Sequence, residues 1–381
     1  MQTKNTIAEV EIAATTGFQR NTTSLRNAML AAMLLASATG NGLAQWSGPE
    51  DAFLPSPVRT LSTVPANGDV NPYGVAFVQE KFETGTGPLK HGDILVSNFN
   101  NSNNEQGTGT TIVRVPASGS PSLFFQGKTG LGLSTALGTL QYGFVVVGNA
   151  PTTDGSSATA KAGSLLVINN KGTLIQTVAN KWIQYPWDMA LVDHGDAAIA
   201  FVTNALNGTV SRLDFHVGSS GLTLLKATTI ASGYIHHGDP VALFVAPTGL
   251  VYEEKRDLLY VASTGDNAVY AIRDAASTQS DNGPGFIVYQ DNVHLHGALG
   301  LAEAPNGHLL VSNNDTVNSD PTQPSEIVEF TKDGTFVKEL SVDPNQGGSF
   351  GLALSSSHDQ SIFAAVDDNT STLIVWTLNL P

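Results

Sequence analysis

The 381-residue chain contains no cysteine, which excludes disulfide bonds, thiol nucleophiles and thiolate metal ligands. It is also poor in charge, since only 13% of its residues are Asp, Glu, Lys or Arg. Acidic residues outnumber basic ones by 33 to 18, and no segment gathers Lys and Arg. The composition therefore argues against nucleic acid and anionic membrane surfaces as partners, because both require a basic patch.

Familiar catalytic motifs are missing as well. The sequence has no Walker-type phosphate loop, no His-Glu-x-x-His pair and no dinucleotide fingerprint after a strand. What it has instead is glycine, with 38 residues, and stretches of Ser, Thr and Asn between short apolar runs. This composition is typical of a loop-rich β protein.

The first 44 residues are predicted to be an export segment. A polar lead with three basic residues precedes an apolar run at 28–38, and small residues at 42 and 44 suit cleavage before Gln45. The run is shorter than the ~20 residues that span a bilayer. The alternative is a tail with one short amphipathic helix, because the lead is long and contains two glutamates. Export of an acidic, cysteine-free chain predicts a bacterial periplasmic or extracellular protein.

An internal repeat dominates the rest of the chain. Six apolar strand patterns end in a small polar residue, at Asn98, Asn149, Asn204, Ser263, Asn313 and Asp367. Ahead of each lies another short strand pattern, and the starts of these recur every 51 to 61 residues. Two further strands follow in five of the six units. Six repeats of four antiparallel strands predict an all-β fold, a six-bladed β-propeller formed by residues 45–381 as one domain.

The sixth unit ends one strand short at the C-terminus. We predict that residues 58–64, from the N-terminal side, supply the missing strand and close the ring, because a closed ring leaves no unpaired blade face.

The repeat resembles the NHL type of six-bladed propeller. Residues 246–274 and 299–315 contain that family's Pro-x-Gly-Leu or Gly-Leu start, its apolar-Val strand and its Asn/Ser strand end. A looser likeness extends over residues 57–379. The resemblance implies the fold and little about function, since such propellers serve as lactonases, lyases and binding scaffolds.

In such a propeller the first strand of each blade lines the channel and the second runs antiparallel to it. The six polar strand ends should therefore form a polar ring at one channel mouth, although such residues also cap strand ends by bonding to turn backbone. The residues just ahead of the first strands face the same mouth. They are Tyr73, Leu133, Trp187, Thr248, Leu299 and Phe350.

The chemistry of this mouth favours a polar organic ligand. Resemblance to gluconolactonase-type propellers would imply a divalent ion held by Glu, Asn and Asp at these positions, but none of the six carries such a group, and only Asp188 comes close. Aromatic walls with amide groups suit sugars or other polyhydroxy compounds. The alternative is that Tyr73, Trp187 and Phe350 only plug the channel.

Two histidine-rich connectors cross the same face. His236, His237 and Asp239 precede the fourth blade, and Asp291, His294 and His296 precede the fifth. If they meet, they would bind a divalent metal ion or supply a general base. A virginiamycin-lyase-like propeller would also place a catalytic His near this mouth. The alternative is that these histidines bond to connector backbone.

Three polar loops rise on the mouth side, at 99–110, 150–163 and 314–325, and are longer than usual hairpin connections. Such loops often carry binding specificity, but they also occur as solvated decoration. We therefore expect an exported propeller that binds a small polar molecule, a glycan or a protein at the mouth, with a metal-assisted hydrolase or lyase as the alternative. A propeller without any small-molecule site is a third option. The predicted ligand-binding residues are Tyr73, Asn98, Asn149, Trp187, Asp188, Asn204, His237, His296, Asn313, Phe350 and Asp367.

Overall fold

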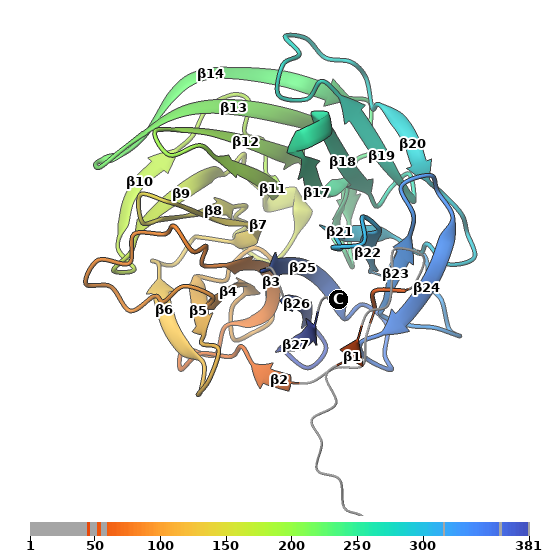
Figure 1. Ribbon diagram of the computed structural model, residues 1–381, viewed down its shortest axis with the longest axis horizontal. Coiled ribbons are helices and arrows are strands. Elements are labelled where there is room, and N and C mark those ends of the chain that lie inside the picture. The colour runs from red at the N-terminus through yellow and green to blue at the C-terminus, as the bar shows by residue number, and fades with distance from the viewer. Residues whose placement is uncertain (1–43, 46–51, 55–58, 315–316, 358–359, 380–381) are drawn as a thin grey trace, which may run out of the picture. The chain divides into compact units, whose positions relative to one another are not determined.

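The computed structural model describes residues 44–45, 52–54, 59–314, 317–357 and 360–379, and these residues form a six-bladed β-propeller (Figure 1). Two single-turn 3₁₀ helices, η1 (Ser157–Thr159) and η2 (Glu254–Arg256), are the helices of this described part. None of its helices has the length and apolarity to cross a membrane. The predicted fold class is thus confirmed.

Five blades are four-stranded antiparallel sheets whose strands follow chain order from the channel outward, and the sixth has three such strands, to which strands from the N-terminal side are added (Figure 1). The blades are β3 (Val70–Phe77), β4 (Ile94–Asn100), β5 (Thr111–Val115) and β6 (Ser122–Gln126); β7 (Leu133–Leu140), β8 (Phe144–Asn149), β9 (Ser164–Asn169) and β10 (Leu174–Val178); β11 (Pro186–Asp193), β12 (Ala197–Asn204), β13 (Thr209–Gly218) and β14 (Gly221–Ser232); β17 (Pro247–Glu253), β18 (Leu258–Ser263), β19 (Ala268–Arg273) and β20 (Phe286–Tyr289); β21 (Ala298–Glu303), β22 (Leu309–Asn313), β23 (Glu326–Phe330) and β24 (Phe336–Ser341); and β25 (Ser349–Ser356), β26 (Gln360–Asp367) and β27 (Thr372–Asn379).

The sixth blade receives strands from the N-terminal side. β2 (Arg59–Ser62) pairs antiparallel with β27, from Arg59 opposite Val375 to Ser62 opposite Thr372. β1 (Ala44–Gln45) pairs in parallel with the end of the same strand. That this N-terminal pairing closes the ring stays a prediction. Apart from Ala44, the predicted export segment lies outside the described residues.

Apolar side chains fill the spaces between blades. Six buried clusters correspond to the six blade interfaces, so each sheet packs on both faces, as the apolar strands require. The inner strands approach closely enough to need glycine. A Cβ atom on Gly351 would lie 1.9 Å from the Tyr73 carbonyl oxygen, and one on Gly300 would lie 2.3 Å from the Phe350 oxygen. The repeated small residues of the first strands are explained by this contact.

Hydroxyl groups also join neighbouring blades. Ser97, Thr203 and Ser312 each accept a hydrogen bond from a backbone N–H in their own blade and donate to a first-strand carbonyl of the next. Thr135 and Thr248 link two further interfaces by donating to the Trp187 and Ala298 carbonyls. Five of the six interfaces therefore have such a link. At the sixth, between blades six and one, Val366 stands at the matching position, and no hydroxyl bridge is formed within the described residues.

Candidate ligand site at the channel mouth

The six residues of the predicted polar ring lie at one mouth, opposite the starts of the first strands. The pairs are Pro72 with Asn98, Leu133 with Asn149, Pro186 with Asn204, Pro247 with Ser263, Ala298 with Asn313 and Ser349 with Asp367. All six are buried, with at most 8% of their surface exposed. The strand register therefore places all six residues at the same face of the propeller.

Their side chains cap turns. Asn98 Nδ2 donates to the Thr63 carbonyl at 3.1 Å and to Thr111 Oγ1 at 3.2 Å. Asn204 Oδ1 accepts the backbone N–H of Gln184 at 2.8 Å. The others bond similarly: Asn149 to Gly132 N and Ser164, Ser263 to Asp266, Asn313 to the His294 carbonyl and Glu326, and Asp367 to Thr370. These are the contacts of strand-end caps, and direct ligand contact of the six stays a prediction.

Aromatic rings fill the mouth just inside this ring of caps. Tyr73 stacks between Phe350 and Phe99, with ring centroids 4.4 and 4.7 Å apart. Trp187 meets Tyr73 edge-on at 5.8 Å. The three aromatics singled out in the sequence are at most 4% exposed and belong to one cluster. Their faces pack on one another, so ring stacking on a sugar is not what this arrangement favours.

We call the stacked rings of Tyr73, Phe99, Trp187 and Phe350 the plug. A hairpin from the connector between blades three and four covers it. Its strands are β15 (His237–Asp239) and β16 (Leu243–Val245). Phe244 packs on Tyr185 with 4.8 Å between ring centroids. The hairpin tip is held by Gln106, whose Nε2 donates to the Val241 carbonyl at 2.7 Å. Loop 99–110 of the first blade thus fastens the hairpin across the mouth.

Two bulky residues that pack in the same cluster as the plug have strained backbones. Tyr185 has φ of 67° and Leu243 has φ of 63°, in the left-handed region that costs a non-glycine residue about 1–3 kcal/mol. Asn71, at the edge of the plug, has φ of 58°, which asparagine tolerates better. Strain of this kind gathers at functional sites.

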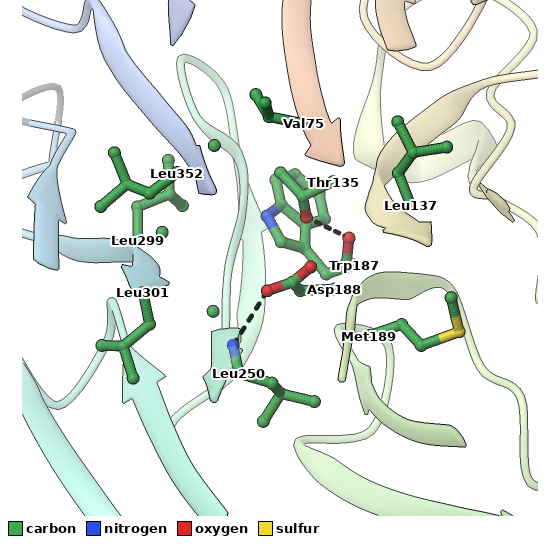
Figure 2. A pocket seen from close by; sticks show the side chains of 13 residues that line it. Val75, Thr135, Leu137, Trp187, Asp188, Met189, Leu250, Leu299, Leu301 and Leu352 are labelled. Atoms are coloured by element: carbon green, nitrogen blue, oxygen red, sulfur yellow. Dashed lines mark hydrogen bonds between the residues drawn. The ribbon is translucent and has the colours of Figure 1, made fainter. Parts of the chain in front are cut away.

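Below the plug, the channel encloses a cavity of about 80 Å³ (Figure 2). Its walls are mainly aliphatic, and Asp188 is the charged side chain that reaches it. Asp188 Oδ2 accepts the Leu250 N–H at 2.9 Å. The indole Nε1 of Trp187 is buried without a hydrogen-bond partner. A space of this size holds two or three waters at ~30 Å³ each.

Burial raises the pKa of the Asp188 carboxyl to about 6, although N–H groups of Leu250 and Met189 oppose the shift. Its side chain is partly buried and lines the channel cavity. Asp188, which was predicted to lie at the mouth, thus lies inside the channel, beneath the plug.

A second cavity, of about 200 Å³, opens on the mouth face beside the plug. Tyr73 and Phe350 form part of its wall, and the hairpin contributes Val241 and Ala242. The remaining lining is mostly side-chain amide: Asn71, Asn100, Asn104, Gln106, Asn314, Gln346 and Asn369. We call this space the mouth cavity. Its lining is more polar than that of most small-molecule sites, which are predominantly apolar, and it therefore favours a polar ligand over an apolar one.

The mouth cavity contains one acid, Asp368. No hydrogen bond to its carboxylate is formed within the described part of the chain, and its backbone N–H bonds to Gly348. Burial, together with the charge of Asp367, raises the pKa of the Asp368 carboxyl to about 7. Burial also raises the pKa of Asp367. Asp368 is therefore a desolvated acid without a partner.

Two residues of the lining have unpaired amide oxygens that lie behind the cavity surface. Within the described part of the chain, Asn71 Oδ1 and Asn100 Oδ1 have no hydrogen-bond partner and less than 1 Å² of accessible surface, and both residues are at most 4% exposed. An unpaired buried polar group costs about 1–3 kcal/mol, so a native structure retains one only where something else satisfies it.

Next to the mouth cavity, the long loops of blades one and two form a polar groove of about 440 Å³. Asn101, Glu105 and Thr108 of loop 99–110 and Thr152 and Thr153 of loop 150–163 contribute to it. Loop 99–110 therefore borders both spaces. The third loop, 314–325, reaches the mouth cavity through Asn314, and residues 315–316 lie outside the described part.

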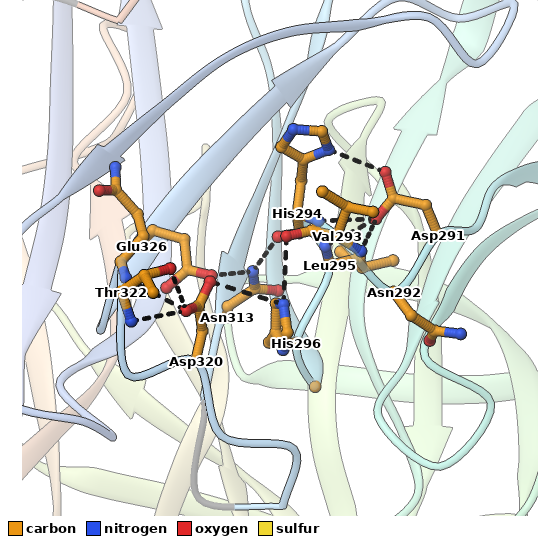
Figure 3. A network of polar contacts seen from close by, with 12 residues as sticks. Asp291, Asn292, Val293, His294, Leu295, His296, Asn313, Asp320, Thr322 and Glu326 are labelled. Atoms are coloured by element: carbon orange, nitrogen blue, oxygen red, sulfur yellow. Dashed lines mark hydrogen bonds and ion pairs between the residues drawn. The ribbon is translucent and has the colours of Figure 1, made fainter. Parts of the chain in front are cut away.

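The histidines of the fifth blade's connector belong to a polar network (Figure 3). His294 Nδ1 lies 3.0 Å from Asp291 Oδ2, and its ring stacks on Phe336. His296 Nε2 lies 3.2 Å from the Val293 carbonyl and 3.6 Å from an Asp320 oxygen. These contacts tie the connector to its own blade.

The histidines of the hairpin bond locally. His236 Nδ1 contacts the Tyr234 carbonyl, and His237 Nδ1 contacts the Gly238 carbonyl. Among the residues that the structure describes, no three His, Asp or Glu side chains lie close enough together to hold a metal ion. The two histidine segments therefore do not form a common metal-binding cluster within the described residues.

Three residues of the mouth cavity were not predicted from the sequence: Asn71, Asn100 and Asp368. Asn100 lies two residues beyond the predicted ring position Asn98, and Asp368 lies one residue beyond Asp367. Asn71 precedes Pro72, where a polar residue in a turn is ordinary. The sequence feature that could have pointed to Asn100 and Asp368 is a second polar residue shortly after two of the strand ends, in Asn98-Phe99-Asn100 and Asp367-Asp368.

No protein-family model matches the chain, and no curated protein matches it. Among solved structures, it is similar to a catalytically inactive virginiamycin B lyase from Staphylococcus aureus with quinupristin, at 12% identity and a TM-score of 0.45, over 83% of this chain and 98% of that one. It is similar to a luciferin-regenerating enzyme, at 13% identity and 0.48, over 84% and 95%.

A third similar structure is regucalcin, a calcium-binding protein from Agrobacterium tumefaciens, at 13% identity and a TM-score of 0.48, over 81% and 90% of the two chains. These neighbours are propellers of the NHL and gluconolactonase-like kind, as the resemblance in the sequence implied. At such identities and scores the likeness assigns neither an activity nor a ligand.

Proposed function

We propose that this propeller binds a small polar ligand in the mouth cavity, where Asp368 and the lining amides make the polar contacts and Tyr73 and Phe350 form the apolar wall. The observation that carries the proposal is the lining of one space of about 200 Å³, which combines side-chain amides, the Asp368 carboxylate and an aromatic wall. A ligand that hydrogen-bonds to Asp368 offsets part of the cost of burying that carboxylate.

The size of the mouth cavity limits the ligand. Pockets for drug-sized molecules measure ~300–1,000 Å³, so a cavity of about 200 Å³ suits a monosaccharide or a smaller molecule. The neighbouring groove extends the surface along loops 99–110 and 150–163, where further units of a longer ligand or a protein partner would lie.

The strained plug supports a binding role. Tyr185 and Leu243 hold left-handed backbone conformations, and the hairpin that carries Leu243 is fastened to loop 99–110. A rigid wall keeps the polar groups in place before the ligand arrives, which lowers the entropy cost of binding. We further propose that the protein is exported by way of residues 1–44 and meets its ligand outside the cytoplasm.

Ligand-induced shifts of the thermal melting point test the proposal, with saccharides, polyols and small amines as the panel. The informative variant is Asn100→Leu, which removes an unpaired oxygen and fills part of the mouth cavity. Asn103→Leu makes the same change at an exposed position of the same loop. At least one compound should raise the melting point of the wild type and of Asn103→Leu but not of Asn100→Leu. Equal shifts in all three proteins would place the ligand elsewhere.

A further inference from the structure

We propose that the opposite end of the channel holds a second ligand site, which takes a small, uncharged, apolar molecule that carries a hydroxyl group. The site is a space of about 520 Å³ between the ends of the first strands of blades one to four, and we call it the vestibule. It is separate from the mouth cavity, which lies where the first strands begin.

The vestibule lies where four inner strands leave the channel. Residues from the C-terminal halves of β3, β7, β11 and β17 line it, and these strands belong to neighbouring blades of the ring (Figure 1). Leu137 and Leu250 also line the channel cavity that contains Asp188, so the two spaces adjoin. The vestibule is therefore the outer part of the channel on this face.

The walls of the vestibule are mainly apolar. Sites for small molecules measure ~300–1,000 Å³ and are lined mostly by hydrophobic and aromatic side chains, with a few polar groups among them. The vestibule has this size and this lining, and its larger apolar wall residues are Phe77, Leu137, Leu191, Val192, Val251 and Tyr252. All of these except Leu137 are only half-buried, so an apolar ligand that covers them removes hydrophobic surface from water.

The amide of the lining leaves an acceptor for the ligand. Gln79 Nε2 donates to Asp193 Oδ2 at 2.9 Å and to the Thr139 carbonyl at 2.8 Å, which fixes the orientation of the amide. Gln79 Oε1 has no hydrogen-bond partner among the described residues. The Asp193 carboxylate also accepts the backbone N–H groups of Gln141 and Gly195, so this acid is satisfied within the protein. A single hydroxyl matches the one free amide oxygen, and it brings fewer polar atoms against the apolar wall than a larger polar group does.

The charges of the lining favour an uncharged ligand. Its acids are Asp193 and Glu254, and no Lys, Arg or His is part of it. A carboxylate ligand would therefore face two acids without a compensating cation. The Glu254 side chain is 65% exposed, so an ammonium group would lose hydration to the apolar wall and gain only a solvent-screened ion pair.

Calorimetric titration of the purified protein at neutral pH tests the inference with three probes of similar shape. They are 4-propylphenol, its methyl ether 4-propylanisole, and 4-propylbenzoate. The phenol should bind about threefold to tenfold more tightly than the ether, because the ether lacks the donor of one hydrogen bond. The benzoate should show no measurable binding.

Two variants locate the binding site. Leu191→Gln makes the wall polar and should weaken binding of the phenol at least fivefold. Leu174→Gln is the matched control, since it makes the same change at a residue of β10 that is 40% exposed and lies outside the lining, and it should leave the affinity unchanged. If Leu191→Gln does not fold, Val251→Thr makes a smaller change in the same wall and should weaken binding at least twofold.

Three results would overturn the inference. If the wall variants bind the phenol as tightly as the wild type and Leu174→Gln do, the compound binds elsewhere. If the ether or the benzoate binds as tightly as the phenol, the vestibule does not select an uncharged hydroxyl compound. If no probe binds at its solubility limit, the vestibule is not a ligand site of this class. The proposed function concerns the mouth cavity and does not depend on any of these results.

Discussion

Replacement of the channel acid by its amide, Asp188→Asn, is expected to stabilise the protein at neutral and alkaline pH. The asparagine keeps an oxygen for the Leu250 N–H, which lies 2.9 Å from Asp188 Oδ2, and it removes a charge from an enclosed cavity of about 80 Å³. The substitution changes neither the volume of the side chain nor the strand pairing of β11.

The magnitude follows from the shifted pKa. Burial raises the pKa of Asp188 to about 6, about two units above that of the same acid in the unfolded chain, and each unit corresponds to ~1.4 kcal/mol. The folded protein binds this proton more tightly than the unfolded chain, so the acid's contribution to stability is present below about pH 4 and is lost as the pH rises through 6. The wild type should therefore be less stable than the variant by about 2–3 kcal/mol at pH 8 and by about 0.5 kcal/mol at pH 4.

Urea unfolding of the two proteins at micromolar concentration measures this difference at pH 8 and pH 4, on either side of the isoelectric point of about 4.8. Asp196→Asn, at an exposed turn, serves as the control and should change stability by less than ~0.5 kcal/mol at either pH. A variant that is destabilised at pH 8, or that differs from the wild type equally at both pH values, would refute the reasoning.

Three other substitutions test the ring and its plug. Deletion of residues 59–62, which pair with β27, should lower the melting temperature by several degrees if this strand closes the ring, and an unchanged melting temperature would exclude that role. Val366→Thr should place a hydroxyl near the Tyr73 carbonyl, as Ser312 does for Phe350, and raise the free energy of unfolding by ~0.5–1.5 kcal/mol; a loss of stability would show that the hydroxyl stays unpaired. Phe350→Ala, at a side chain 4% exposed and stacked on Tyr73, should cost ~3–5 kcal/mol in urea unfolding, and a cost below 1 kcal/mol would show that the plug is not a packed core.

The fold was predictable because the repeat is a physical requirement. Each blade must be apolar on both faces and must bring its first strand close to the next blade, so short apolar strands and small residues recur at a spacing that a single sequence reveals. The register that places Asn98 opposite Pro72 and Asp367 opposite Ser349 follows from the same repetition.

The site was predictable only in part. The aromatic wall could be named from the sequence, because Tyr73 and Phe350 occupy a repeated position. Asp368 and Asn100 lie beyond the repeat, and the property that distinguishes them, the lack of a partner in a buried place, depends on side chains from other blades. The hairpin that carries Val241 and Leu243 is a single insertion, so no periodicity pointed to it.

The role of the strand-end residues shows how one pattern fits two explanations. An asparagine after an apolar strand suits both a cap and a ligand contact, and the choice depends on where its amide points. Asn204 Oδ1 accepts a hydrogen bond from the Gln184 N–H, and Asn204 Nδ2 donates to Thr209 and Ser211. Both ends of its amide therefore bond within the protein. Asn71 retains a free oxygen, and that difference cannot be read from the sequence.

The most direct measurement of the central claim is a crystal structure of the protein soaked with the compound that raises its melting point most. The account predicts density for that compound in the mouth cavity, with polar atoms within hydrogen-bond distance of Asp368 or of the amides that line the cavity. Density confined to the groove between the first two blades or to the opposite end of the channel, with water alone in the mouth cavity, would contradict it.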